Sequence, residues 1–590
     1  MSAAKKESRG SPSSVSPSPS TGSKAKSAAP DKVAQRTSPK KIYITALLLV
    51  LAVLLAYINS LGGPFVLDDQ ASIANNPSIQ HGWYAALFPP ANGEAVTGRP
   101  LVNLTFAANF QFDQWRHYDG FSVSGYHAVN LLIHLLAGLT LFGLIRRTLL
   151  LPSLREQFAG RALDIAFIAS LLWLLHPLQT ESVTYLSQRA EELMSLFYLL
   201  TLYGFVRGVE GAGRLSWLFL SLTSCLLGVF CKEVIVTAPL LVFLFDRTFV
   251  AGGFAAAWRT RKNYYLALAA TWLPLAGLVA QAGGRGGSAG FIAGAEPVRY
   301  LLTQTHAIIV YLQLSLWPRP LVFDYGNNLI GSVGEAAPYL LAIILLLAGT
   351  IHLLKHRPKL GFLAAGFFLV LAPSSSFVPI MTDTMAEHRM YLPLAAVMVF
   401  VTLGLSLLPE RRMFLFAGAA LAAVLAGQTF ARNDDYKSAF TLWRDTVVKR
   451  PDVARAHENF GAELLQAHQV DAQAGEVQLG ARELGDSIVE FQQAIALQST
   501  YPEAENNLGS ALAQQGQVAK AVPHFAQAAA GLRLPHEKAM AYFNLGYALG
   551  QLGRYQEAVA ADTQCLALEP GFVPAQTALA DAKQHSPTSP

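Results

Sequence analysis

Eleven apolar segments, each 16 to 20 residues long, follow one another between residues 42 and 430. They lie at 42–61, 126–145, 163–178, 192–208, 214–231, 234–249, 264–282, 338–354, 361–379, 391–408 and 413–430. A membrane-spanning helix needs about 20 predominantly apolar residues, so the sequence predicts about eleven transmembrane helices. The chain is 52% hydrophobic and only 14% charged, whereas soluble domains average about 25% charged residues. A single soluble core is excluded.

The first apolar segment follows a tail rich in Ser, Pro and Lys. This tail has no apolar period and cannot bury enough surface to offset the entropy of folding, so residues 1–40 are predicted to be a disordered basic tail. The segment after it is longer than the apolar part of a cleaved signal peptide, which spans about 7–15 residues. We therefore expect it to remain as a membrane anchor.

The distribution of Lys and Arg predicts how residues 41–431 are oriented. With the N-terminus in the cytosol, sixteen of the 24 basic residues in this range lie on the inner side and eight on the outer side, as the positive-inside rule requires. An odd number of spans places the C-terminal region outside, in a periplasm or a secretory lumen. Counting the apolar stretch at 301–317 would invert every later loop, so we interpret it as an interfacial or re-entrant helix.

Residues 432–590 have a different pattern, in which helical segments carry a recurring Asn-Xaa-Gly motif. The three copies are Asn459-Phe460-Gly461, Asn507-Leu508-Gly509 and Asn544-Leu545-Gly546. Small residues follow the last two copies at matching offsets, which is typical of tetratricopeptide repeats of about 34 residues. The alternative is an unrelated helical bundle. The predicted fold class is all-α, with a multi-span membrane domain followed by an α-solenoid whose concave surface binds peptides.

The net charge of +5 does not indicate a nucleic-acid partner. Residues 1–40 contribute +6, residues 41–431 contribute +5 and residues 432–590 contribute −6, so the basic character comes from the tail and the membrane region. Three cysteines, Cys225, Cys231 and Cys565, are too few for a disulfide framework. No His/Cys spacing fits a zinc site and no glycine-rich turn fits a nucleotide. No cofactor is predicted with certainty, and metal dependence stays open.

Ionisable residues gather on the predicted outer side, and charges near a membrane usually face a cavity or a pathway. Asp68 and Asp69 follow the first span. Adjacent carboxylates suit a general base, which takes a proton from an attacking hydroxyl, or a site for a divalent cation. A solvated turn or a helix cap is the alternative explanation.

Cationic side chains on the same side suit a lipid phosphate, since Arg offers a rigid fork of donors to phosphate oxygens. The candidates are Arg99, Arg189, Lys232, His388 and Arg389, and the other polar candidates are His127, His176, Glu181 and Glu387. The alternatives are an ion pair of Arg189 with Glu191 and Glu192, a structural Lys232–Glu233 pair, a solvated helix start at 387–389, and core histidines at 127 and 134.

Short motifs occur in a specific order along the chain. They are Phe65-Val66-Leu67-Asp68-Asp69, Asn75-Asn76-Pro77, Arg99-Pro100-Leu101, Tyr126-His127-Ala128-Val129-Asn130, His176-Pro177, Thr180-Glu181, Gln188-Arg189-Ala190-Glu191, Lys232-Glu233, Trp317-Pro318, Phe323-Asp324, Glu387-His388-Arg389-Met390-Tyr391-Leu392-Pro393 and Arg432-Asn433. With these motifs in this order, the chain resembles the TMTC family of transmembrane, tetratricopeptide-repeat-containing O-mannosyltransferases. The resemblance covers almost everything after residue 42.

The resemblance implies a GT-C glycosyltransferase fold at 41–431, with extracytoplasmic repeats at 432–590. It implies an enzyme that moves a sugar, mannose or a related hexose, from a polyprenyl-phosphate donor to Ser or Thr hydroxyls of exported proteins, and we expect the transfer to be inverting. Asp68 and Asp69 match the family's catalytic pair. The expected location is a bacterial inner membrane or the endoplasmic reticulum. The rival hypotheses are transfer to a lipid or polysaccharide, and a non-enzymatic scaffold or transporter whose repeats dock partners.

Overall fold

A computed structural model describes residues 38–586 apart from 91–94, 212, 282, 284–295, 377 and 381–382. The regular elements in these ranges are helices, which confirms the predicted all-α class. Residues 1–37 of the predicted tail lie outside the described part of the chain, and helix α1 begins at Pro39.

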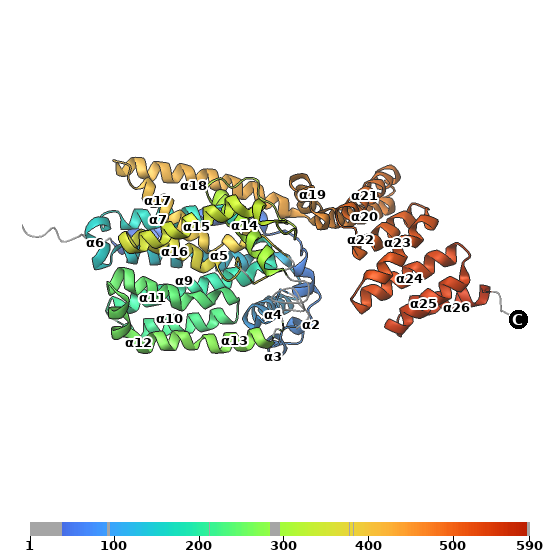
Figure 1. The fold of residues 1–590 in the computed structure, drawn as a ribbon, viewed down its shortest axis with the longest axis horizontal. Helices are drawn as coiled ribbons and strands as arrows, with labels where there is room; N and C mark the ends of the chain where they lie inside the picture. Colours follow the sequence, from blue (N-terminus) through green and yellow to red (C-terminus); the bar gives the residue numbers. More distant parts are fainter. Residues whose placement is uncertain are drawn as a thin grey trace, which may run out of the picture.

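The membrane domain is a bundle of long helices that lie side by side along the long axis of the molecule (Figure 1). Its main helices are α1 (Pro39–Tyr57), α5 (Val123–Leu149), α7 (Ala162–Leu174), α9 (Arg189–Val209), α10 (Arg214–Val229), α11 (Ala238–Phe245), α12 (Phe254–Ala270), α13 (Trp272–Gln281), α15 (Val333–His356), α16 (Pro358–Leu371), α17 (Pro393–Leu405) and α18 (Arg411–Asn433). One large apolar core runs through this bundle and includes Trp173, Phe245 and Phe414.

Six segments among the described residues are long and apolar enough to cross a membrane. They are Pro39–Ser60, Val123–Leu149, Leu186–Val209, Phe254–Gln281, Val333–His356 and Arg411–Lys437. A seventh is added if α6 (Pro152–Phe158) and α7, which meet at 95°, form one span. Helices α10, α16 and α17 are apolar but shorter. The chain is therefore a multi-pass membrane protein, and the number eleven stays a prediction.

Two of the predicted spans that fall short are interrupted, one by proline and one by changes of helix type. Helix α7 ends at Leu174, shortly before His176-Pro177, because proline disfavours the helical conformation in the residue before it. The segment predicted at 234–249 is divided into a 3₁₀ turn at Glu233–Thr237, helix α11 and a π turn at Asp246–Val250. The stretch 301–317 falls on α14 (Pro297–Leu316), which is not among the six segments.

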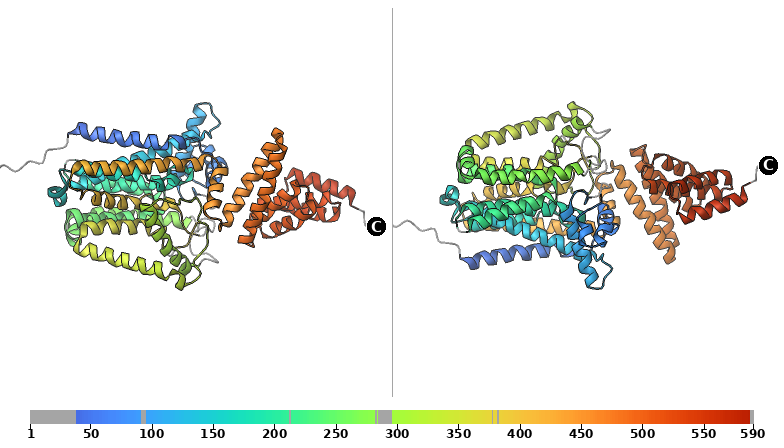
Figure 2. Two further views of the ribbon diagram at one scale, coloured as in Figure 1. Left: turned by 90° about the horizontal axis from the view of Figure 1, so that it is seen from above. Right: turned by 90° about the horizontal axis from the view of Figure 1, so that it is seen from below.

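Short helices mark the two ends of the bundle. Helices α2 (Pro77–Gln80), α3 (Trp83–Ala86) and α4 (Pro100–Trp115) follow the first span and lie at the end where the repeats begin, and α6 lies at the opposite end (Figures 1 and 2). The first loop therefore shares one end of the bundle with the C-terminal region.

The C-terminal region is a stack of antiparallel helices that extends away from the bundle (Figure 2). Its helices are α19 (Ala439–Lys449), α20 (Ala454–Ala474), α21 (Val477–Leu497), α22 (Pro502–Gln514), α23 (Val518–Gly531), α24 (Pro535–Gln551), α25 (Tyr555–Leu568) and α26 (Val573–His585). Helices α20 with α21, α22 with α23, and α24 with α25 pack as successive pairs.

The recurring glycine of the Asn-Xaa-Gly motif marks the closest approach within each pair. A Cβ on Gly461 would lie 2.8 Å from the Phe491 ring, and a Cβ on Gly509 would lie 2.7 Å from the Phe525 ring. Only glycine leaves room for these rings, so the motif follows from packing. In the third pair, Gly546 instead faces Asp562.

An apolar cluster attaches the repeat array to the membrane domain. Tyr185 and Phe323, from loops of the membrane domain, pack with Trp443 and Val453 at the start of the array. The ring centroids of Phe323 and Trp443 are 5.4 Å apart, and those of Tyr185 and Phe323 are also 5.4 Å apart. The repeats therefore rest directly on the loops that surround Asp68.

Candidate functional site

The two adjacent carboxylates of the first loop have different surroundings. Asp69 is fully buried; its Oδ1 accepts hydrogen bonds from the Ser187 amide at 2.7 Å and from the Ser187 hydroxyl, and its Oδ2 accepts one from the Val66 amide at 3.2 Å. Asp68 is exposed, and its amide donates to the Tyr185 hydroxyl at 3.1 Å. Asp69 anchors the loop, whereas the Asp68 carboxylate is presented outward.

The turn that leads into the two carboxylates is strained. Leu67 has φ +42°, a left-handed conformation that residues with a Cβ rarely adopt. Such strain persists only where surrounding contacts hold it, and it concentrates at functional sites. Here the three hydrogen bonds to Asp69 hold the turn, which keeps Asp68 exposed.

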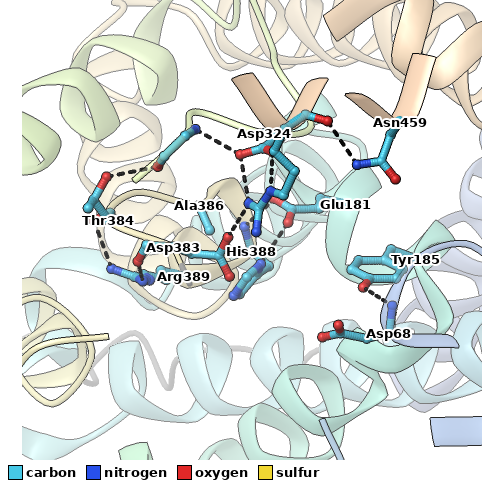
Figure 3. A network of polar contacts seen from close by, with 12 residues as sticks. Asp68, Glu181, Tyr185, Asp324, Asp383, Thr384, Ala386, His388, Arg389 and Asn459 are labelled. Carbon is cyan, nitrogen blue, oxygen red and sulfur yellow. Dashed lines mark hydrogen bonds and ion pairs between the residues drawn. The ribbon is translucent and has the colours of Figure 1, made fainter. Parts of the chain in front are cut away.

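Asp68 points toward a set of polar side chains that we name the junction network (Figure 3). Its members are Asp68, Glu181, Tyr185, Asp324, Asp383, His388 and Arg455. They come from loops of the membrane domain and from α20, the first full repeat helix. The network therefore brings together segments more than 380 residues apart in the sequence.

The carboxylates of the first loop titrate above their usual range. Burial raises the pKa of Asp69 to about 7, although the hydrogen bonds from Ser187 and Val66 lower it. Desolvation raises the pKa of Asp68, and the Asp383 carboxylate raises it further, whereas Arg455 and Arg99 lower it. A carboxylate with a raised pKa that stays accessible is a better general base near neutral pH.

Glu181 and His388 form the second part of the junction network. Glu181 lies on α8 (Thr180–Thr184); its Oε2 accepts a hydrogen bond from the His388 amide at 2.8 Å, and its Oε1 lies 2.7 Å from His388 Nδ1. Burial raises the pKa of Glu181 to about 8 and lowers that of His388 to about 3. Both shifts favour the uncharged forms of the two side chains.

Arg455 forms the third part and comes from the repeat array. Its Nε and Nη2 donate to Asp324 Oδ2 and Oδ1 at 2.6 and 2.8 Å, and Nη2 also donates to Asp383 Oδ1 at 2.9 Å. Gly326, whose amide donates to Asp324 Oδ1 at 2.7 Å, in turn accepts a hydrogen bond from Thr384 Oγ1 through its carbonyl. Two loops of the membrane domain are thus joined to each other and to α20.

Two of the predicted phosphate ligands are enclosed by protein. Arg189 is fully buried and donates to Asn130 Oδ1 at 2.6 Å, to Asn109 Oδ1 at 2.7 Å and to the Tyr126 carbonyl at 2.9 Å. Arg389, also buried, donates to the carbonyls of Ser374, Thr384 and Asp383. Both arginines hold the surrounding framework in this structure.

Lys232 and Arg99, two further predicted phosphate ligands, lie beside acidic residues. Lys232 forms an ion pair with Glu191 at 2.7 Å, and Arg99 lies 3.8 Å from Glu233. Burial lowers the pKa of Lys232, and Arg99 lowers it further, which shows that these two cations influence each other. Lys232 also lowers the pKa of His388, and Arg99 lowers the pKa of Asp68. Arg389 also lowers the pKa of His388, so Arg99 and Lys232 are two of several cations coupled to the junction network.

The remaining sequence candidates have structural partners. His127 Nε2 lies 2.9 Å from the Gly63 carbonyl, and His176 Nε2 lies 3.1 Å from the Ser315 carbonyl. Glu387 accepts hydrogen bonds from the Val322 amide at 2.5 Å and from the Tyr325 hydroxyl at 2.8 Å. The described residues contain no group of three or more His, Cys, Asp or Glu that suits a metal ion.

The sequence reasoning missed Arg455, Asp383, Ser187 and Tyr185 as parts of the site. Ser187 and Tyr185 precede the Gln188-Arg189 motif and carried no signal of their own. Asp324 belonged to a recognised motif but had no assigned role. Arg455 lies in the repeat region, where a charged residue near a helix start is usually solvated surface.

Comparisons with known proteins agree with the two-part organisation. The family model "Tetratricopeptide repeat" matches residues 500–568. Human "Protein O-mannosyl-transferase TMTC4" is 25% identical over 471 residues, which cover 70% of this chain and 62% of the human protein. "Protein O-mannosyl-transferase F38B6.6" of Caenorhabditis elegans is 25% identical over 440 residues, covering 70% of this chain and 59% of that protein. The resemblance to the TMTC family is thus confirmed, and the chain spans about 60% of the length of these relatives.

Among solved structures, an Archaeoglobus fulgidus oligosaccharyltransferase shares 12% sequence identity with this chain. The match covers 68% of this chain and 55% of that one, with a TM-score of 0.37. A TM-score this low does not establish a common fold.

Proposed function

We propose that this chain, which resembles the TMTC O-mannosyltransferases over 70% of its length, is an inverting membrane glycosyltransferase. It moves a sugar, mannose or a related hexose, from a polyprenyl-phosphate donor to Ser or Thr hydroxyls of exported proteins. The observation that carries this proposal is the contrast between buried Asp69 and exposed Asp68, because it leaves one accessible carboxylate at the meeting point of bundle and repeats.

Asp68 is the proposed general base. Its carboxylate takes the proton of the acceptor hydroxyl, and the acceptor oxygen attacks the anomeric carbon of the sugar. The bond from that carbon to the phosphate oxygen breaks, and the lipid phosphate leaves with the bonding electrons. Asp69 takes no part in proton transfer, because its oxygens already accept three hydrogen bonds; it positions Asp68.

Arg99 and Lys232 are the proposed contacts for the departing phosphate. This group gains negative charge in the transition state, where fixed cations in a partly desolvated site are most effective. Arg99 lowers the pKa of Asp68 and that of Lys232, so the three groups share one electrostatic environment. Arg189 and Arg389 support the framework instead, because their donors are directed at internal acceptors.

The test uses the full chain in nanodiscs with a radiolabelled polyprenyl-phosphate mannose and an unfolded exported protein. Wild type is expected to label the protein, and Asp68→Asn is expected to lose about 10²–10⁴-fold in rate, the usual contribution of a general base. Asp119→Asn is the matched control, since Asp119 is another exposed carboxylate of the first outer segment. Label that appears only in a lipid or polysaccharide fraction would favour the rival acceptor class. No transfer by wild type with several sugars would reject the proposal.

A further inference from the structure

We propose that Arg455, on the first full repeat helix, is a positioning residue of the transfer reaction. By joining Asp324 and Asp383 it fixes the two loops that face Asp68, so the repeat array completes the reaction site as well as presenting acceptors. This inference rests on the proposed function.

The start of α20 is seated firmly on one of these loops. Val453, the residue before α20, packs against Gly326 so closely that a Cβ on Gly326 would lie 3.2 Å from Val453 Cγ2. Gly326 has φ +75°, a conformation that glycine adopts without strain. The loop can therefore approach the helix closely, which places Asp324 opposite Arg455, the second residue of α20.

Stability alone does not explain the contact of Arg455 with Asp383. The Arg455 side chain is 33% exposed and that of Asp383 is 40% exposed, and ion pairs at such positions contribute about 0–1 kcal/mol, whereas Asp324, the bidentate partner of Arg455, is only 2% exposed. The cluster of Tyr185, Phe323 and Trp443 already attaches the array through apolar burial. What Arg455 adds is geometry, because a bidentate arginine fixes the direction of its partner.

Arg455 also contributes to the electrostatics of the proposed base. The charged and titratable groups that act on Asp68 are Asp69, Arg99, Tyr185, Asp383 and Arg455. Arg99 and Arg455 are the two cations of this set, and Arg99 donates to the Ala95 carbonyl at 2.7 Å within its own segment. Removing Arg455 takes away the only cation in this set that comes from the repeats and leaves the charge of Asp383 in place.

The experiment compares Arg455→Gln, Arg455→Lys and wild type in the transfer assay from pH 5 to pH 8, with saturating donor. Arg455→Gln is expected to lower kcat about tenfold and to move the acid limb of the pH profile upward by about half a unit or more. Arg455→Lys keeps the positive charge but loses the bidentate guanidinium donors. It should therefore lose activity while the acid limb stays near that of wild type. Arg482→Gln is the matched control, because Arg482 is an exposed arginine of α21 that pairs with Asp486.

The outcomes separate this inference from the proposed function. An active wild type together with an Arg455→Gln variant whose acid limb and kcat are unchanged overturns the inference only. An Arg455→Gln variant that loses activity equally at every pH, with a lowered melting temperature, also overturns it, since that pattern indicates docking alone. An inactive wild type rejects the proposed function and this inference with it.

Discussion

Asp69 binds Ser187 through both donors of that residue, the backbone amide at 2.7 Å and the side-chain hydroxyl. The first loop is thereby tied to the segment between α8 and α9, 118 residues away. This tie sets the direction of the neighbouring Asp68, so the two carboxylates are expected to respond differently to mutation.

Asp69→Ala is expected to destabilise the protein, because it leaves the buried amides of Ser187 and Val66 without an acceptor. Each buried group left unsatisfied costs about 1–3 kcal/mol. The measurement is the melting temperature in nanodiscs, with Asp68→Ala as the control. Equal melting temperatures for the two variants would contradict the distinction between an anchoring and an accessible carboxylate.

The Glu181–His388 pair predicts how stability depends on pH. The pKa of Glu181 rises from 4.5 to about 8 on folding. Its contribution to the free energy of unfolding is therefore complete below pH 4.5 and is lost as the pH rises toward 8. The pKa of His388 falls from 6.5 to about 3, so its contribution is complete above pH 6.5 and is lost as the pH falls toward 3. Between pH 4.5 and 6.5, the two contributions to stability change in opposite directions as the pH rises. Between pH 6.5 and 8, this pair contributes only the loss of stability due to Glu181.

Glu181→Gln should therefore flatten the decline in melting temperature between pH 6.5 and 8. Glu296→Gln, at an exposed site, is the control and should follow wild type. A Glu181→Gln variant whose decline equals that of wild type would show that this carboxyl does not hold its proton in the folded state.

Arg189→Lys tests whether this arginine stabilises the fold through its hydrogen bonds or binds the phosphate of the donor lipid. Arg189 donates through Nε, Nη1 and Nη2 in three directions, and a lysine ammonium cannot reproduce that fork. We expect a loss of stability of about 3 kcal/mol or more, seen as a lower melting temperature without donor. A normal melting temperature combined with weaker donor binding would restore Arg189 as a phosphate ligand.

Asp562→Phe is expected to stabilise the repeat array. Both carboxylate oxygens of Asp562 are buried without a hydrogen-bond partner, and burial raises the pKa of Asp562 to about 6. The equivalent places in the other pairs, opposite Gly461 and Gly509, hold Phe491 and Phe525. Pulse proteolysis of the full chain should show slower cleavage within α24–α26, and cleavage as fast as in wild type would contradict the prediction.

Reporter fusions test the orientation. If the predicted eleven spans are correct, a reporter after Pro590 is exported and a reporter near His356 stays in the cytosol. A cytosolic C-terminal reporter would mean that the number of spans is even, with α14 as the first candidate for the additional one.

The sequence predicted the architecture because apolar length and the Asn-Xaa-Gly spacing depend on local requirements, namely bilayer thickness and a ring that packs over glycine. It could not decide between Asp68 and Asp69, because the decision lies in the strained turn at Leu67 and in hydrogen bonds to Ser187. Arg189 and Arg389 were predicted as phosphate ligands from residue type and from their place on the predicted outer side. Their depth in the fold depends on tertiary packing, which one sequence does not display.

The contact between α20 and the outer loops also bears on biosynthesis. Residue 455 follows every predicted membrane helix in the chain, so it is synthesised after all of them. In the proposed topology the first repeat helix must cross the membrane before Arg455 reaches Asp324 and Asp383. If the proposed function holds, a chain whose first repeat helix has not yet been exported works below its full rate, which limits turnover of the donor lipid during synthesis.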